Sequence, residues 1–206
     1  KSIEDIKRIQ ELFGEKFAGI STHEGHTYRW ASRQRERIIA RGMSARNDMI
    51  NLAKRLRKEG VDVRRVSMGS TPFLPYFEND RRHTITDIKP GNSVYFDGTA
   101  VDLGIAVPEN CAVTVLASVL GRKKIGKDLG RVITNAGSKT LSEAQRPHAE
   151  TGRSAVYGKV CTDLSAIGVV DEARIEHLSE EIGWIDVLLA DLHNTMFATG
   201  QLLRLI

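Results

Sequence analysis

The sequence predicts an α/β fold in the first half of the chain and antiparallel β-structure in the second half. Before about residue 100, helical and β-branched segments alternate, which is typical of parallel α/β units. After Lys89-Pro90-Gly91-Asn92, short β-rich segments follow one another between clusters of Gly, Asn, Asp and Lys, which is typical of antiparallel sheets. We therefore expect residues 1–100 and 101–206 to form two domains of different architecture.

Caps and glycines mark the elements of the first half. Ser2 is a suitable N-cap for a first helix, and Gly14 follows its last apolar residue. A long charged stretch has apolar residues at helical spacing, and Gly42 and Ser44 favour its division into two helices, the second ending at Gly60. The expected elements are a helix over 3–13, a buried strand over 17–22, two helices within 32–59 and a strand over 61–66.

The second half is predicted to consist of strands separated by polar turns, with no convincing helix among the runs from Ala112 to Val170. Each candidate strand is a short run rich in β-branched, aliphatic or aromatic residues. These runs lie at 94–96, 112–120, 131–134, 155–160, 168–170, 185–189 and 201–206.

Composition describes an ordinary globular protein and excludes several classes. The chain has 206 residues, which is long enough to bury a core. Its residues are 41% hydrophobic and 27% charged, as in ordinary globular proteins. A net charge of +4 helps to hold an anionic ligand but is too small for a nucleic-acid signature. No apolar run is long enough to span a bilayer, and Cys111 and Cys161 have no metal or redox spacing, so we expect a cytoplasmic protein with reduced thiols. Because the chain begins at Lys1 without an initiator Met or a signal peptide, we interpret it as a piece of something longer.

The strand expected over 61–66 leads into a turn that suits a phosphate group. Met68-Gly69-Ser70-Thr71 combines small residues with two hydroxyl groups. Consecutive backbone N–H groups in such a turn can donate hydrogen bonds to phosphate oxygens, and the short side chains leave room for the anion. An ordinary polar turn has the same composition, so the residues alone leave both interpretations open.

A second polar segment, Thr22-His23-Glu24-Gly25-His26-Thr27-Tyr28, follows the strand expected over 17–22. In a parallel α/β barrel, active sites are built at this end of the strands. His23 and His26 are therefore candidate proton carriers, and Tyr28 is a candidate ligand contact. The alternative is a polar loop whose histidines bond to neighbouring backbone groups.

A third candidate is the pair Asp191 and His193, which follows an apolar run. In an extended segment, residues i and i+2 project on the same side, so the two side chains can reach one cation. The alternative is a hydrogen-bonded Asp–His pair at a strand end.

The basic stretch from Arg29 to Lys58 raises the possibility of a nucleic-acid surface. Its only acidic residues are Glu36 and Asp48. The basic residues recur all around the predicted helices instead of forming one stripe, so we favour a solvated outer face.

Together these segments resemble the D-threonine aldolase and D-serine dehydratase family. Members of that family are pyridoxal phosphate enzymes with an alanine-racemase-like barrel and a C-terminal β domain. The resemblance implies that residues 1–100 are the second half of a TIM-like (β/α) barrel and that residues 101–206 are a D-serine dehydratase-like antiparallel β domain. The matching stretches, in the family's order, are 22–28, Gly69-Ser70-Thr71-Pro72, Lys89-Pro90-Gly91-Asn92, 135–142 (Asn-Ala-Gly-Ser-Lys-Thr-Leu-Ser) and Leu178-Ser179-Glu180-Glu181.

The resemblance also implies roles for individual residues. Gly69 and Ser70, together with Thr71, would hold the phosphate of pyridoxal 5'-phosphate, and Tyr28 would lie against the cofactor ring. His23 or His26 would carry a proton in the reaction.

The same resemblance implies a divalent metal, zinc or manganese. The family's pair of metal ligands has a counterpart in Asp191-Leu192-His193-Asn194-Thr195, with the two ligand types in swapped order. Asp191 and His193 would then hold the metal, which would polarise the substrate hydroxyl as a Lewis acid.

Three departures from the family pattern stand out. Ser93 replaces a tyrosine that often follows Pro-Gly-Asn, and Ile182 replaces a histidine that often follows Ser-Glu-Glu. No lysine matches the family's Schiff-base lysine, which lies on the first barrel strand. We therefore expect that the chain begins in the second half of the barrel and is inactive alone. A missing N-terminal half or a second copy in a homodimer would cover its open sheet edges.

The sequence thus predicts part of a lyase that acts on D-configured β-hydroxy amino acids. Cleavage of the D-threonine aldolase type and dehydration of the D-serine type stay equally open. The alternative is a non-catalytic relic of the same fold that binds an anionic metabolite. Nucleic-acid binding ranks last, and no membrane partner is expected.

Overall fold

The computed structural model describes residues 2–29, 35–141, 157–161 and 169–206. It divides into two compact units, Lys1–Ser93 and Val94–Ile206. The sequence placed the change of architecture a few residues later, near residue 100. The assignment of each half to a family domain stays a prediction.

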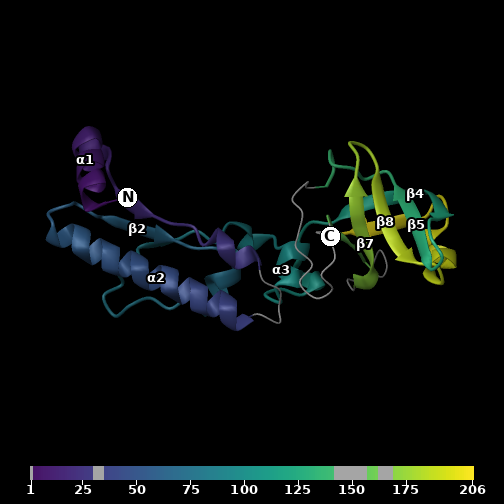
Figure 1. Ribbon diagram of the computed structural model, residues 1–206, viewed down its shortest axis with the longest axis horizontal. Coiled ribbons are helices and arrows are strands. Elements are labelled where there is room, and N and C mark those ends of the chain that lie inside the picture. Colours follow the sequence, from purple (N-terminus) through teal and green to yellow (C-terminus); the bar gives the residue numbers. More distant parts are fainter. Residues whose placement is uncertain (1, 30–34, 142–156, 162–168) are drawn as a thin grey trace. The chain divides into compact units, whose positions relative to one another are not determined.

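The first unit has the predicted alternation of helices and parallel strands. Its main elements are α1 (Ile3–Phe13), β1 (Gly19–Ser21), α2 (Arg35–Lys58), β2 (Arg65–Met68) and β3 (Asp87–Ile88). The three strands form a parallel sheet in the order β1-β2-β3, with Ile20 opposite Val66 and Met68 opposite Ile88. Figure 1 shows α2 as a long helix that runs beside β2.

Helix α1 begins and ends as its sequence predicts. The Ser2 backbone N–H donates to the Asp5 carboxylate at 2.8 Å, and the Asp5 N–H donates to the Ser2 hydroxyl at 3.2 Å. This reciprocal capping box satisfies two N–H groups at the start of the helix. Gly14 ends the helix with a φ of +53°, a conformation that glycine adopts without a Cβ penalty.

The expected division of residues 32–59 into two helices is wrong. Described residues from Arg35 to Lys58 form one 24-residue helix, α2, in which Gly42 is buried. A Cβ atom at Gly42 would lie 2.1 Å from Phe73 Cδ2. The glycine therefore serves close packing of the helix against the segment after β2 and does not break the helix.

The strand boundaries in the first unit also differ from the prediction. β2 begins at Arg65 instead of Val61, although Val61 and Val63 are buried in the core. β3 spans only two residues and was not predicted. Hydrophobic burial explains the pattern at 61–63, because core packing and strand pairing produce the same β-branched sequence signal.

The second unit is a closed antiparallel barrel preceded by a short helix, α3 (Gly98–Asp102). The strands pair in the order β4-β5-β8-β7-β6-β9, so the predicted antiparallel architecture is confirmed. Figure 1 shows β4, β5, β7 and β8 side by side in this barrel. Their bounds are β4 Val115–Lys124, β5 Leu129–Thr134, β6 Lys159–Cys161, β7 Val169–Leu178, β8 Gly183–Leu188 and β9 Leu202–Leu205.

One expectation for this half is wrong, and one short helix was not predicted. Residues 94–96 are not a strand, because Gly91–Val94 forms a 3₁₀ turn. Helix α3 was not predicted and lies before the β-rich runs; its N-cap Asp97 accepts hydrogen bonds from the N–H groups of Thr99 and Ala100 at 2.8 and 3.0 Å. A short capped turn of this kind carries too few residues to show helical periodicity in a sequence.

Each unit has its own hydrophobic core. The first unit buries one face of α2 against β2, including Ile50, Leu56, Val66 and Met68. The barrel interior is filled by alternate residues of its strands, among them Val119, Val132, Ile175, Ile185 and Leu203. Within the described residues, no helix has the length and apolar character needed to cross a membrane.

Candidate active site

Three polar segments that the sequence singled out lie at the same edge of the parallel sheet. Residues 22–28 follow β1, residues 69–72 follow β2, and residues 89–92 follow β3. Because the strands are parallel, their carboxyl ends share one edge, which is where ligands bind in α/β folds. The hydrogen bonds described next join all three segments into one corner.

Gly69 lies at the centre of this corner. Its φ of +137° is rarely adopted by residues with a side chain, and a Cβ atom there would lie 2.8 Å from the Lys89 backbone nitrogen. Among the described residues, the N–H groups of Gly69, Ser70 and Thr71 have no hydrogen-bond acceptor in the protein. Three consecutive donors beside a position that excludes a Cβ form a possible cradle for an anion.

The Ser70 side chain is held inside the protein by Thr27. Ser70 is 1% exposed and Thr27 is completely buried, and their hydroxyl oxygens lie 3.0 Å apart. Thr27 Oγ1 also donates to the Glu24 carbonyl at 2.6 Å. Since the single Thr27 hydroxyl hydrogen is used there, the Ser70 hydroxyl donates to Thr27 and keeps its own oxygen as an acceptor.

Thr71 fixes the neighbouring turn. Its hydroxyl donates to the Pro90 carbonyl and accepts a hydrogen bond from the Asn92 N–H at 3.1 Å. Both bonds join the end of β2 to the Pro-Gly-Asn turn after β3. Thr71 is 2% exposed, so its hydroxyl has a structural task in this state, and the predicted contact with a cofactor phosphate stays a prediction.

His23 and Tyr28 lie on the exposed side of the same corner. His23 Nδ1 lies 2.9 Å from the Gly69 carbonyl oxygen, and the His23 and Tyr28 rings are 6.2 Å apart between centroids. A carbonyl can only accept, so Nδ1 carries the hydrogen and Nε2 of a neutral ring has a free lone pair. His26, the other predicted proton carrier, is exposed on the 3₁₀ turn Gly25–Arg29.

Lys89 and Glu24 belong to this corner but were not among the predicted site residues. The Lys89 ammonium group donates to the Ser21 hydroxyl at the end of β1. It therefore provides a positive charge at the edge of the sheet where Gly69 lies. The position of Lys89 directly after a parallel strand could have indicated that it belongs to the site. That strand, β3, spans only two residues and is too short to be recognised in the sequence.

Glu24 is the least expected feature of the corner. It is 1% exposed, and within the part of the chain that the structure describes neither carboxyl oxygen has a hydrogen-bond partner. Burying such a group without a partner costs several kcal/mol, on the order of 2–7 for a polar group and more for a charge. The burial of Glu24 could not be predicted from the sequence, because nothing there distinguishes a buried glutamate in a polar loop from a solvated one.

The anion cradle fits a phosphate, although it is covered in this structure. Gly69, Ser70 and Thr71 are all buried. Buried N–H groups without acceptors are rare in proteins, and a phosphate would supply the missing oxygens.

The predicted metal pair has a different geometry from the one expected. Asp191–His193 forms a 3₁₀ turn in the second unit, with Leu192 buried and His193 exposed. The expectation that Asp191 and His193 project on one side of an extended segment is therefore wrong. No group of three or more potential ligands that could hold a metal occurs among the described residues. The pair therefore does not form a metal site alone, and its metal role stays a prediction.

The other two motifs of the sequence meet in the second unit. The Ser138 N–H donates to the Ser179 carbonyl at 2.8 Å, and the Lys139 N–H donates to the Glu180 carbonyl at 3.1 Å. Lys139 Nζ lies 2.6 Å from Glu181 and 3.1 Å from Glu180, and these two contacts raise the pKa of the Lys139 ammonium group. Both loops are thus parts of one exposed polar cluster.

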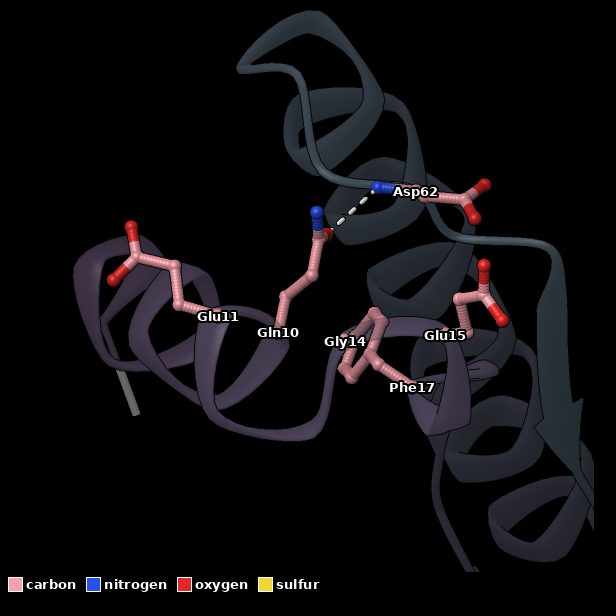
Figure 2. Close-up of a pocket in the computed structure, with 6 residues that line it drawn as sticks. All are labelled: Gln10, Glu11, Gly14, Glu15, Phe17 and Asp62. Atoms are coloured by element: carbon pink, nitrogen blue, oxygen red, sulfur yellow. Dashed lines mark hydrogen bonds between the residues drawn. The ribbon is translucent and has the colours of Figure 1, made fainter.

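A pocket in the first unit lies at the opposite edge of the sheet (Figure 2). It is bordered by the segments that precede β1 and β2, and the Asp62 N–H donates to the Gln10 side chain at 2.8 Å. In α/β barrels the amino ends of the strands serve stability and not catalysis. We therefore place the candidate site at the carboxyl ends. The pocket is lined by Gln10, Glu11, Gly14, Glu15, Phe17 and Asp62.

Comparison with known proteins agrees with this fold. Residues 112–206 match the model of the putative serine dehydratase domain. The chain is 30% identical over 148 residues to D-threo-3-hydroxyaspartate dehydratase of Delftia sp. (strain HT23), a match that covers 72% of this chain and 37% of that protein. It is 28% identical over 129 residues to D-serine dehydratase of Dictyostelium discoideum, covering 62% of this chain and 31% of that protein.

Solved structures show the fold of the whole chain. The Delftia dehydratase superposes with a TM-score of 0.74 at 26% identity, over 98% of this chain and 52% of that structure. An alanine racemase-like protein of Idiomarina loihiensis superposes with a TM-score of 0.71 at 24% identity, over 98% and 51%. The predicted fold class, part of an alanine-racemase-like α/β barrel followed by an antiparallel β domain, is confirmed.

The chain thus has an alanine-racemase-like fold. Its residues 112–206 are a domain of the serine dehydratase type, and the predicted resemblance to the D-threonine aldolase and D-serine dehydratase family is confirmed. The chain spans about a third of the two curated relatives and about half of the two solved chains.

Proposed function

We propose that the protein to which this chain belongs is a pyridoxal-phosphate-dependent lyase acting on D-configured β-hydroxy amino acids. The relatives support this proposal through their names, which are those of D-amino acid dehydratases. The structural observation that carries it is the corner at Gly69, where free N–H donors, a lysine and a histidine–tyrosine pair meet. Dehydration and aldol cleavage both fit this arrangement.

The residues of the corner would divide the work of binding the cofactor. The N–H groups of Gly69, Ser70 and Thr71 would hold the phosphate, with Lys89 adding charge beside them. Tyr28, which is half-buried near His23, would lie against the ring. When bound, the cofactor would serve as the electron sink for the bonds that break at the substrate α-carbon.

His23 is suited to holding or moving a proton at Nε2. The Gly69 carbonyl fixes its Nδ1–H at 2.9 Å and thereby sets the ring orientation. A Cβ at Gly25 would lie 3.2 Å from His23 Cδ2, so a larger residue at Gly25 would crowd the ring. His26 is the second candidate for proton transfer. Replacing His23 and His26 one at a time by Asn or Gln would show which of the two histidines the reaction needs.

A divalent metal is the less supported part of the proposal. One structure of the Delftia dehydratase is of a cysteine-to-alanine variant in a metal-free form, so metal is a variable in that relative. Asp191 and His193 do not form a site on their own among the described residues, and we derive no step from them. Metal analysis of the full-length protein with and without His193→Ala tests the role: an unchanged metal content would exclude it.

The alternative is a non-catalytic protein of the same fold that binds an anionic metabolite. It is the second interpretation that the sequence leaves open. Both proposals predict binding at Gly69, but only the first predicts a visible absorption band on addition of pyridoxal phosphate to the full-length protein. Release of a keto acid and ammonia from D-serine or D-threo-3-hydroxyaspartate, or of glycine from D-threonine, would establish the lyase. Binding without turnover of any of them would favour the alternative.

A further inference from the structure

His23 holds the peptide group between Gly69 and Ser70 by its carbonyl oxygen. The imidazole lies in the loop after β1, and its Nδ1 is 2.9 Å from the oxygen of Gly69, which directly follows β2. Because a carbonyl oxygen only accepts, Nδ1 is the donor. His23 and Gly69 are 46 positions apart in the chain, so this bond fixes one loop against the next.

The geometry of this peptide decides where its N–H group points. The peptide is trans, since no cis peptide bond occurs in the described chain, and in a trans peptide the C=O and N–H bonds point in opposite directions. With the carbonyl turned to His23, the Ser70 N–H is therefore directed away from the imidazole. Among the described residues it has no acceptor in the protein, so it stays available to an anion.

Gly69 gives this peptide more rotational freedom than another residue would, because it has no side chain to restrict the backbone. A half-turn of the peptide would bring the carbonyl oxygen to the side of the N–H group, where its partial negative charge would repel a phosphate. The same half-turn would carry Ser70 from its extended φ of −143° to a positive φ, which serine rarely adopts. The bond from His23 and the backbone of Ser70 thus favour the same orientation.

The loop after β1 also holds the Ser70 side chain. Thr27 of this loop is completely buried, and its hydroxyl oxygen is 3.0 Å from that of Ser70. One loop therefore contacts both residues of the peptide, Gly69 through His23 and Ser70 through Thr27. Such contacts preorganise the turn before a ligand arrives, which lowers the free-energy cost of binding.

We propose that His23 is a positioning residue for the cofactor phosphate, acting through its Nδ1–H group. The bond keeps the Gly69 carbonyl oxygen out of the anion position and presents the Ser70 N–H to the phosphate. It also polarises the peptide, which strengthens the N–H group as a donor. The inference rests on the proposed function and deepens it, because it gives the two nitrogens of one imidazole separate tasks: Nδ1 serves cofactor binding, and Nε2 serves proton transfer.

Binding of pyridoxine 5'-phosphate relative to pyridoxine isolates the contribution of the phosphate. Neither probe has the aldehyde that reacts with lysine, and contacts to the ring cancel in the ratio of their dissociation constants. Calorimetric titration of the cofactor-free full-length protein measures this ratio, the phosphate preference. In His23→Leu we expect the phosphate preference to fall about tenfold, the size of one lost hydrogen bond. In His23→Asn it should stay within about twofold of the wild-type value, because the asparagine NH₂ group can take the place of Nδ1–H.

His83→Asn is the matched control, because His83 is an exposed histidine before β3 and outside the corner. It should keep the wild-type phosphate preference. An unchanged preference in His23→Leu, or equal losses in His23→Leu and His23→Asn, would overturn the positioning role while the phosphate site stands. Rescue by His23→Gln instead of His23→Asn would also overturn it, because the longer glutamine side chain imitates Nε2. If the wild type binds both probes equally, the proposed phosphate site fails, and this inference fails with it.

Discussion

Ser70 donates its hydroxyl hydrogen to Thr27, 3.0 Å away, and this buried bond closes the corner between β1 and β2. The consequence is that the Ser70 oxygen is free to accept while its hydrogen is occupied. A phosphate at this corner would therefore be bound first by backbone N–H groups. The Ser70 hydroxyl could join only by turning away from Thr27.

Thr27→Val tests this bond. Valine keeps the shape of threonine but leaves the buried Ser70 hydroxyl without its acceptor, so the free energy of unfolding should fall by about 1–3 kcal/mol. Urea unfolding followed by circular dichroism measures the change. The double variant Thr27→Val/Ser70→Ala should recover part of the loss, and no recovery would contradict the assignment of donor and acceptor.

Gly69→Ala should be strongly destabilising. Its φ is +137°, and the new Cβ would lie 2.8 Å from the Lys89 nitrogen, so strain and a clash with backbone combine to cost about 2–4 kcal/mol. Gly60→Ala is the matched control, since Gly60 has a φ of +82° but nothing within 4 Å of its Cβ position. Equal losses in the two variants would show that the approach of Lys89 is unimportant.

Gly42→Ala separates helix propensity from packing. Alanine in an exposed helix interior gains up to about 1 kcal/mol over glycine. Here the Cβ would meet the Phe73 ring, at 2.1 Å from Cδ2, so we expect a net loss of about 1–3 kcal/mol. Combining Gly42→Ala with Phe73→Leu should cost less than the sum of the two single changes, and strict additivity in urea unfolding would contradict the contact.

The hydrogen bonds of the Asp80 carboxylate should make the stability of the protein depend on pH in the acid range. The Thr84 backbone N–H and hydroxyl donate to its carboxylate at 2.6 and 2.7 Å, and these bonds lower the pKa of Asp80 below its ordinary value of 3.8. A depressed pKa in the folded state stabilises the protein above pH 3.8, and the contribution disappears as the pH falls through the folded pKa. The Tm difference between wild type and Asp80→Asn should therefore be larger at pH 6 than below pH 3. A constant difference across this range would contradict the hydrogen-bond assignment.

Local patterns in the sequence predicted the architecture well. The alternation of helices and β-branched runs gave the parallel units, and the short apolar runs between polar turns gave the antiparallel barrel. Ser2 and Gly14 were identified correctly as the ends of the first helix, because a cap depends only on neighbouring residues. Elements determined within a few residues are readable in a sequence.

Features that depend on distant contacts could not be predicted. Gly42 looks like a helix breaker until Phe73, 31 residues later, is seen packed against it. The two-residue strand β3 has too few residues for a periodic signal, which concealed the place of Lys89 in the site. The extended geometry expected at Asp191 and His193 was replaced by a 3₁₀ turn, since the preceding strand β8 ends at Leu188.

Part of the set of candidate residues selected from the sequence lies together, whereas Asp191 and His193 lie in the second unit. His23, Tyr28, Gly69, Ser70 and Thr71 were all selected from the sequence, and the structure brings them into one corner. The unsatisfied carboxyl group of Glu24 could be found only from burial. A polar residue in a loop gives no local indication of whether water reaches it.

The central claim is that the corner at Gly69 binds the phosphate of pyridoxal 5'-phosphate. Its most direct test is a titration of the cofactor-free full-length protein with pyridoxal 5'-phosphate, comparing wild type with Lys89→Met and with Lys16→Met, an exposed lysine before β1. We predict one bound cofactor per chain in the wild type, an affinity at least about tenfold weaker in Lys89→Met, and no change in Lys16→Met. Equal affinities in all three proteins, or no binding to the wild type, would contradict the account.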